Sequence, residues 1–233
     1  MEMLPQPPPG VSPPPADQTA RRSWSWLAWI VIGGFGSLLV LLVLVVTFGV
    51  KSSGGKGHAM IQTTSNARQI GAALYEFQDE YGSCPSPSTV QAVKENTGTT
   101  WRLEDRTANG LLKQLIVTGM MPSEEVFWCQ GSGKKPDNAF AREADALAKG
   151  ECGFAYIVCE APTAPRLVAP LIPGTMRFDP KPFDGTAVVL FGDGKVAHMV
   201  INRAGNALHS GMNLFDPSHP CWAGKPFEVF YPE

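Results

Sequence analysis

Histidine and cysteine residues near the C-terminal end of this sequence have the side chains best suited to chemistry. They are His198, His209, His219 and Cys221. Imidazole and thiolate groups bind zinc, and a cysteine beside a histidine can act as a nucleophile with its base. A single His-x-Cys spacing without a second paired motif defines neither kind of site. The sequence therefore predicts no catalytic residue, no cofactor site and no metal site.

Three aspartates also offer oxygen ligands of the kind that Ca²⁺ takes in proteins. They are Asp184, Asp193 and Asp216, and each is followed by glycine or proline. They are scattered along the chain and lack the closely alternating ligands of a calcium-binding loop. Aspartate before glycine or proline is typical of turns, so we interpret all three as turn residues.

The five cysteines raise the question of disulfides, which are typical of oxidising compartments. Cys152 and Cys159 cannot bond to each other on one extended strand, because seven residues of strand span roughly 23 Å. The pairings that we consider are Cys129 with Cys152 and Cys84 with Cys221. An odd number of cysteines leaves at least one thiol, and Cys159, which lies in an apolar run, is the candidate.

The composition is that of one sizeable domain with additional segments. The chain has 233 residues, of which 44% are hydrophobic and 17% charged, and its formal net charge is −2. No cluster of lysine and arginine alternates with aromatic residues. We therefore expect no nucleic acid partner.

Two segments at the N-terminal end are not typical of a globular domain. Residues 1–23 are rich in proline and poor in large apolar side chains, which predicts a disordered tail. Residues 24–50 include 20 almost continuously apolar residues, from Leu27 to Val46, enough to span a bilayer as a helix. A cleaved signal peptide is the alternative, although the apolar run is longer than usual for one. We predict a transmembrane helix, followed by a Gly/Ser linker over 51–57.

A folded domain is expected over residues 58–233, and it begins with a long helix. Apolar residues over 58–81 recur every three or four positions, which places them on one face of an α-helix. Gly82 ends this helix. Similar patterns predict shorter helices over 108–119 and 136–150. The face of the long helix that must be buried comprises Met60, Thr63, Ala67, Ile70, Leu74, Phe77 and Tyr81.

Strand signals come late in the chain. Short apolar runs over 152–159 and 186–192 predict two strands. Asp193 and Gly194 follow the second run and predict a two-residue hairpin loop of type I′, which leads into a third strand. The residues between these runs, 160–184, are rich in proline and are expected to form a surface loop.

Two of these motifs resemble a known family. The stretch "NARQIGAALYEFQDEYGSCPS" (66–86) combines a helix with a glycine turn and prolines, and "VVLFGDGKV" (188–196) ends a strand at Asp-Gly. With an apolar span before them, they resemble the type IV pilin and type II secretion pseudopilin superfamily. The resemblance implies an α+β fold in which a long helix packs on a small antiparallel sheet. It also implies a bacterial inner-membrane protein, with its N-terminus in the cytoplasm and its C-terminal domain in the periplasm or outside the cell.

The resemblance implies a function as well. Leu39 stands where filament-forming pilins carry a glutamate, so we expect an anchored, non-polymerising protein. We predict a non-enzymatic component of envelope assembly or secretion. Its expected partners are the lipid bilayer, through residues 24–50, and other envelope or secretion proteins, with self-association through the helix as a further option. The alternative is a ligand-binding or sensing module that uses the loop over 160–184.

Overall fold

The structure, a computed structural model, describes residues 54–103, 106–131 and 133–233. The predicted tail over 1–23, the predicted transmembrane helix over 24–50 and part of the predicted linker lie outside these residues. The described part of the chain belongs to one compact unit.

The membrane predictions are corrected by what the structure describes. Within these residues, no helix combines the length and the apolar composition needed to cross a bilayer. The longest helix, α2 (Gly54–Tyr81), exposes charged residues such as Arg68, Glu76 and Asp79. On this finding, the predicted single-pass inner-membrane protein with a periplasmic domain is not retained.

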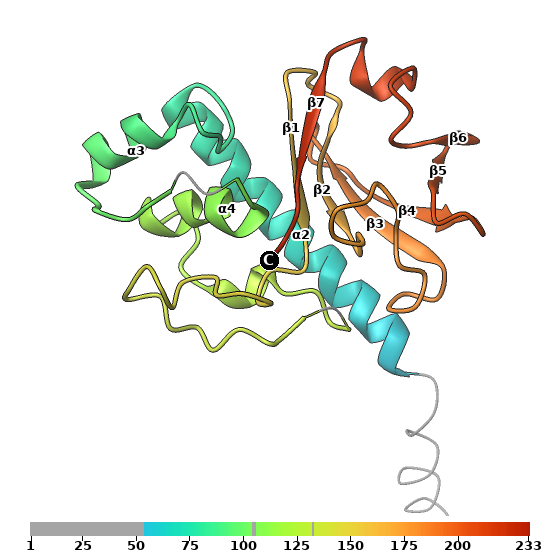
Figure 1. Cartoon of the computed structure of the whole chain (residues 1–233), viewed down its shortest axis with the longest axis horizontal. Coiled ribbons are helices and arrows are strands. Elements are labelled where there is room, and N and C mark those ends of the chain that lie inside the picture. Colours follow the sequence, from blue (N-terminus) through green and yellow to red (C-terminus); the bar gives the residue numbers. More distant parts are fainter. Residues whose placement is uncertain (1–53, 104–105, 132) are drawn as a thin grey trace, which may run out of the picture. The chain divides into compact units, whose positions relative to one another are not determined.

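A seven-stranded antiparallel sheet dominates the described residues (Figure 1). Its strand order is β6-β5-β4-β3-β2-β1-β7, so each strand lies beside its neighbour in sequence, except that β7 returns to pair with β1. The strands are β1 (Ala155–Cys159), β2 (Pro165–Ala169), β3 (Thr186–Phe191), β4 (Val196–Ile201), β5 (Ala207–His209), β6 (Met212–Asn213) and β7 (Phe227–Phe230).

The predicted pilin-like fold is therefore wrong, because the sheet is large and curled rather than a small platform under one helix. The strands that the sequence did not reveal are short or lie beside proline. Strand β2 falls inside the predicted surface loop over 160–184, yet it pairs with both β1 and β3 in the middle of the sheet. Strands β5 and β6 have three and two residues, too few for a pattern of alternation.

Both faces of the sheet are apolar, so successive residues of a strand enter different cores. In β1, Tyr156 packs in the core that contains α2, whereas Ile157 belongs to a second core on the other face. The second core includes residues from 207–222, among which Trp222 is fully buried. Burial on both faces explains why the central strands have nearly continuous apolar sequences.

Helix α2 is the long helix that the sequence predicts, and it begins at Gly54 rather than near residue 58. It lies against β3, and an added Cβ at Gly71 would be 3.1 Å from the side chain of Leu190. The helix ends where Gly82 takes a left-handed φ of 77°. Its fully buried side chains include Ala67, Ile70 and Phe77.

The described residues form four further helical elements, three before the sheet and one between β6 and β7. Helix α4 (Ala108–Val117) confirms the second predicted helix, and Thr107 caps it by accepting a hydrogen bond from the Gly110 N–H. Helix α3 (Val90–Thr97) and the 3₁₀ helices η1 (Glu124–Phe127) and η2 (Pro220–Trp222) were not predicted. Each has eight residues or fewer, which is too short for a clear helical period.

The third predicted helix, over 136–150, is wrong. These residues form turns and irregular structure. Asn138 and Leu147 have φ values of 61° and 41°, which a right-handed helix excludes. The backbone of Leu147 is bound by distant side chains, since its N–H donates to Glu124 and its carbonyl accepts from Asn109. Long-range hydrogen bonds thus override the local helical pattern.

Candidate metal centre

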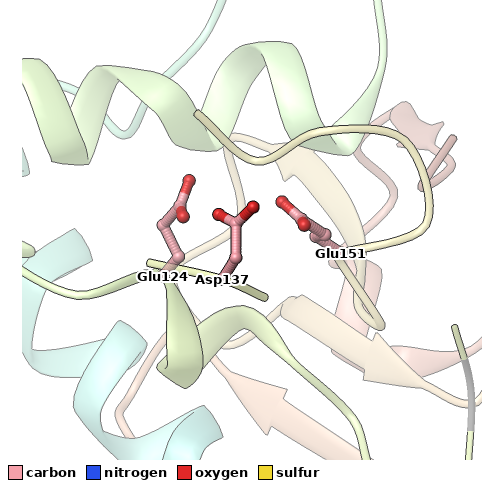
Figure 2. Close-up of side chains that lie close together, drawn as sticks. All are labelled: Glu124, Asp137 and Glu151. Atoms are coloured by element: carbon pink, nitrogen blue, oxygen red, sulfur yellow. The ribbon is translucent and has the colours of Figure 1, made fainter. Parts of the chain in front are cut away.

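Three carboxylate side chains come together beside the irregular segment that leads to β1 (Figure 2). They belong to Glu124, Asp137 and Glu151, and one oxygen from each lies within 4.8 Å of the other two. Glu124 and Glu151 are fully buried, whereas Asp137 is exposed. We name this group the carboxylate cluster. It brings buried negative charge to a position that solvent reaches from one side.

Glu124 is the first residue of η1. Hydrogen bonds from α2 and to the irregular segment around Asn138 fix the backbone of η1. Asn66 of α2 donates from Nδ2 to the carbonyls of Glu125 (3.2 Å) and Trp128 (2.9 Å), and so holds η1. The N–H of Glu124 donates to Oδ1 of Asn138 at 2.8 Å. The buried carboxylate is therefore placed by residues far away in the sequence.

Glu151 stands just before β1 and has a counter-ion. Its Oε1 accepts from Nζ of Lys134 at 2.9 Å, and its Oε2 accepts from the N–H of Ala148 at 2.9 Å. The lysine side chain is 63% exposed, whereas the glutamate side chain is 0% exposed. Hydrogen bonding to Glu151 raises the pKa of the Lys134 ammonium. One end of the cluster is thus partly neutralised by the chain itself.

The loop that carries Asp137 returns to the Glu151 segment through a close backbone approach. The N–H of Lys134 donates to the carbonyl of Gly150 at 2.7 Å. A Cβ added at Gly133, where φ is +77°, would lie only 2.2 Å from that carbonyl oxygen. Asp137 itself accepts from the N–H of Ala139 at 3.0 Å, a turn that orients its side chain.

Asn109 of α4 fixes the other side of the loop. It donates from Nδ2 to the carbonyl of Leu147 at 2.8 Å and accepts from the N–H of Glu233 at 3.1 Å. The N–H of Leu147 then donates to Oε1 of Glu124. Since Asn109 is only 2% exposed, these hydrogen bonds are shielded from water, and the loop has a defined course without helix or strand.

The charge of the cluster is incompletely balanced. Burial raises the pKa of the Glu124 carboxyl, and the neighbouring Glu151 and Asp137 raise it further. The hydrogen bond from the Leu147 N–H opposes this, and so, more weakly, does the nearby N–H of Ala139. Oε2 of Glu124 is buried and has no hydrogen-bond partner. A proton on this atom would relieve the repulsion, with the neighbouring carboxylates as acceptors. A cation held among the carboxylates would satisfy it.

The ligand set selects the class of ion. Carboxylate oxygens suit hard cations such as Ca²⁺ and Mg²⁺, and the cluster has no imidazole or thiolate to favour zinc. Two oxygens bound to one ion at about 2.4 Å are at most about 4.8 Å apart, so the three oxygens lie close enough together to share a Ca²⁺ ion, whereas Mg²⁺ demands shorter and more regular coordination. Exposure of Asp137 leaves room for water ligands. The arrangement fits Ca²⁺ best.

The histidines and the C-terminal cysteine lie outside the carboxylate cluster. Nδ1 of His209 is 3.3 Å from Nε2 of His219, and the N–H of Cys221 donates to Nδ1 of His219 at 3.1 Å. His198 instead contacts α2, with its Nε2 2.8 Å from Oγ1 of Thr64. The structure therefore brings two of the three histidines together and leaves the third on β4.

The aspartates considered from the sequence lie at separate turns. Asp193 and Gly194 are in the loop between β3 and β4, where hydrogen bonding from Lys195 lowers the pKa of Asp193. Gly194 has φ of 81° while Asp193 does not have a positive φ, so the loop is a type I turn with a left-handed glycine instead of type I′. Asp216 accepts from the backbone and hydroxyl two residues on, and Asp184 lies before β3.

The cysteines divide between the two faces of the sheet. Cys84, Cys129 and Cys152 pack with the core that contains α2, whereas Cys159 and Cys221 belong to the second core. Cys129 is near enough to Cys152 to affect its pKa, which burial raises to about 12. In the structure, Cys84, Cys152, Cys159 and Cys221 are free cysteines. The predicted disulfide pairings stay predictions.

The carboxylate cluster was missed from the sequence for a physical reason. Its members are separated by 13 and 14 residues, and no regular element of fixed period connects them. No local spacing could therefore have indicated that they meet. The resemblance to pilins and pseudopilins likewise stays a prediction, without the fold that it implied. Comparison of the chain with protein-family models, with curated proteins and with solved structures finds no match.

Proposed function

We propose that this domain is a non-enzymatic module that binds Ca²⁺ at the carboxylate cluster. The observation that supports the proposal is the buried Oε2 of Glu124, which has no hydrogen-bond partner although it belongs to a carboxylate next to two others. Burial is the main cause of the raised pKa of Glu124 and repulsion from Glu151 and Asp137 adds to it, and a bound cation offsets both. It also replaces the hydrogen bond that this oxygen lacks.

The ion would join three segments that no helix or strand connects. Glu124 belongs to η1, which α2 holds, and Glu151 leads into β1. Asp137 lies in the irregular stretch between them. Because a shared ligand restricts all three segments in the folded state and not in the unfolded state, binding stabilises the domain. We infer a structural use of the cation, since two of its three side-chain ligands are buried away from any substrate.

The test is thermal unfolding of the full-length protein, stripped with a chelator and then supplied with CaCl₂ or MgCl₂. At Ca²⁺ about 100-fold above Kd the gain is about 2.7 kcal/mol, which raises the Tm by about 5–10 °C. Glu124→Gln should lose this gain. Glu125→Gln is the matched control, because Glu125 is adjacent in sequence but pairs with Lys135 outside the cluster. Equal gains in the two variants, or none in the wild type, would refute the proposal.

We also propose that the module acts by binding other proteins, which is the part of the predicted assembly function that needs no membrane. Exposed apolar side chains support it: Ile61 on α2 and Val200 on β4 are 67% and 69% exposed. Thr64, one turn after Ile61, contacts His198, two residues before Val200, so the two apolar side chains belong to neighbouring parts of the surface.

This second proposal is tested by placing a photo-crosslinking amino acid at position 61 and, as a control, at the exposed Arg102. The expected result is a discrete crosslinked protein from position 61 and none from position 102. The same products from both positions, or none from either, would contradict a binding surface at Ile61.

A further inference from the structure

A cavity of about 500 Å³ lies between the β3–β4 hairpin and the chain around β5, β6 and η2. Its apolar wall is formed by Phe191, Val196, Ala197, Met212 and Pro220. This volume is within the range of small-molecule sites, which are mostly apolar with a few polar groups that fix orientation. The cavity shares no residue with the carboxylate cluster, so what it binds is independent of Ca²⁺.

The polar groups of the cavity include two histidines whose proton positions follow from their contacts. The N–H of Cys221 donates to Nδ1 of His219 at 3.1 Å, so this nitrogen is an acceptor. Neutral His219 then carries its proton on Nε2, which faces the carbonyl of His209 at 3.2 Å and Nδ1 of His209 at 3.3 Å. His219 is 3% exposed, which protects this arrangement from water.

The same chain of contacts makes His209 a donor. Because its Nδ1 faces the proton of His219, neutral His209 carries its own proton on Nε2. Burial and the neighbouring His219 lower the pKa of His209, which favours the neutral form. Among the described residues, none accepts a hydrogen bond from this Nε2. The ring lines the cavity and packs against Phe191, with centroids 5.4 Å apart.

The charged residues of the cavity cancel each other. Nζ of Lys195 is 2.7 Å from Oδ2 of Asp193, so neither offers an unbalanced charge to a ligand. The apolar wall, the hydroxyls of Thr163 and Ser210 at its edge and the neutral imidazole of His209 remain. We propose that this cavity binds a small uncharged molecule with an apolar or aromatic body and one carbonyl-type oxygen, which accepts the hydrogen bond from Nε2 of His209.

The test compares two probes of nearly equal shape, acetophenone and α-methylstyrene, in which a methylene group replaces the carbonyl oxygen. Amide resonances of the ¹⁵N-labelled full-length protein are followed during titration. Acetophenone should shift resonances of 191–197, 207–213 and 219–221, and should bind about fivefold to tenfold more tightly than α-methylstyrene, the value of one hydrogen bond. If neither probe shifts these resonances, the site is refuted. Equal affinities in the wild type would refute the donor.

Three variants distinguish binding in the cavity from the hydrogen bond that His209 donates. His209→Phe keeps a ring and leaves the backbone carbonyl that His219 also contacts, so it should abolish only the preference for acetophenone. His198→Phe is the control on β4, away from the cavity lining, and should keep the preference. Ala197→Trp fills the cavity and should prevent binding of both probes. Retention of the preference in His209→Phe would overturn the assignment of the donor.

Discussion

Nζ of Lys134 lies 2.9 Å from Oε1 of Glu151, so an exposed cation of the chain is bound to a fully buried carboxylate of the cluster. A divalent cation at the cluster needs the same negative charge. Lys134 therefore competes with Ca²⁺, either by occupying a ligand oxygen or by repelling the ion. If Lys134 and Glu151 formed only an ordinary surface ion pair, removing the lysine would not change Ca²⁺ binding, so this competition can be tested.

Lys134→Gln should accordingly raise the affinity for Ca²⁺, by about two- to fivefold, since the lysine is largely exposed and its charge is screened. Isothermal titration calorimetry of the full-length protein at low ionic strength measures the effect. Lys135→Gln is the matched control, because Lys135 pairs with Glu125 at 3.1 Å and not with the cluster. An equal change in both variants would mean that overall charge, and not competition for Glu151, is responsible.

Without divalent cations, Glu124 should make stability depend on pH. Its pKa is raised in the folded state, mainly by burial, so the folded protein holds this proton at pH values where the unfolded chain has lost it. The contribution is favourable at low pH and is lost as pH rises from the ordinary value, about 4.3, through the raised pKa. Relative to the wild type, Glu124→Gln should therefore gain stability as pH increases.

Urea unfolding in a chelator between about pH 4 and pH 8 measures this difference. Asp193 and Asp216, whose pKa values are lowered mainly by hydrogen bonds from Lys195 and Ser218, have the opposite dependence. Both are present in wild type and variant, so their contributions cancel in the comparison. Parallel pH profiles for the two proteins would show that Glu124 does not titrate abnormally.

Gly133→Ala should destabilise the loop that carries Asp137. The new Cβ would lie 2.2 Å from the carbonyl oxygen of Gly150 at a φ of +77°, so the loop must move, at a cost of about 2–4 kcal/mol. Gly174→Ala is the control, since it has a φ of +73° but no atom within 4 Å of its Cβ. Its cost should be about 1–2 kcal/mol. Equal losses in urea unfolding would exclude the close approach as the cause.

Asn109→Ala should reduce the free energy of unfolding by about 2–3 kcal/mol, because it leaves the buried carbonyl of Leu147 without its donor. The control is Asn96→Ala, which also removes side-chain hydrogen bonds, to Glu80 and Tyr81, but at an exposed position. Its loss should be about 0.5 kcal/mol. Chemical denaturation of the two variants decides whether Asn109 supports the loop.

Elements with their own periodicity could be predicted from the sequence, and α2 is the clearest case. Its buried residues recur along one face, and Gly82 ends it, so local rules and tertiary packing agree. Strands β3 and β4 were also recognisable as apolar runs on either side of Asp-Gly. In these elements the residues that determine the structure are close together in the sequence.

Elements defined by distant contacts could not be predicted. The pattern over 136–150 favours a helix, but the hydrogen bonds from Leu147 to Glu124 and from Asn109 to Leu147 hold it in irregular turns. The carboxylate cluster depends on that irregular course. Sequence reasoning therefore failed at the loop and at the candidate site for one shared reason.

Because both faces of the sheet are apolar, hydrophobicity alone does not fix the register of β1, and the hydroxyl of Tyr156 does. A one-residue slip of β1 would exchange Tyr156 with Ile157 between the two cores, and hydrophobicity alone would not oppose it, since both positions are buried. The hydroxyl of Tyr156 donates to the carbonyl of Pro85 at 2.8 Å, next to the end of α2. A slipped strand would take this hydroxyl away from the Pro85 carbonyl and bury it among the apolar side chains of the second core, at the cost of its hydrogen bond. The hydrogen bond of a single hydroxyl thus decides which side of β1 faces α2, although both sides are apolar.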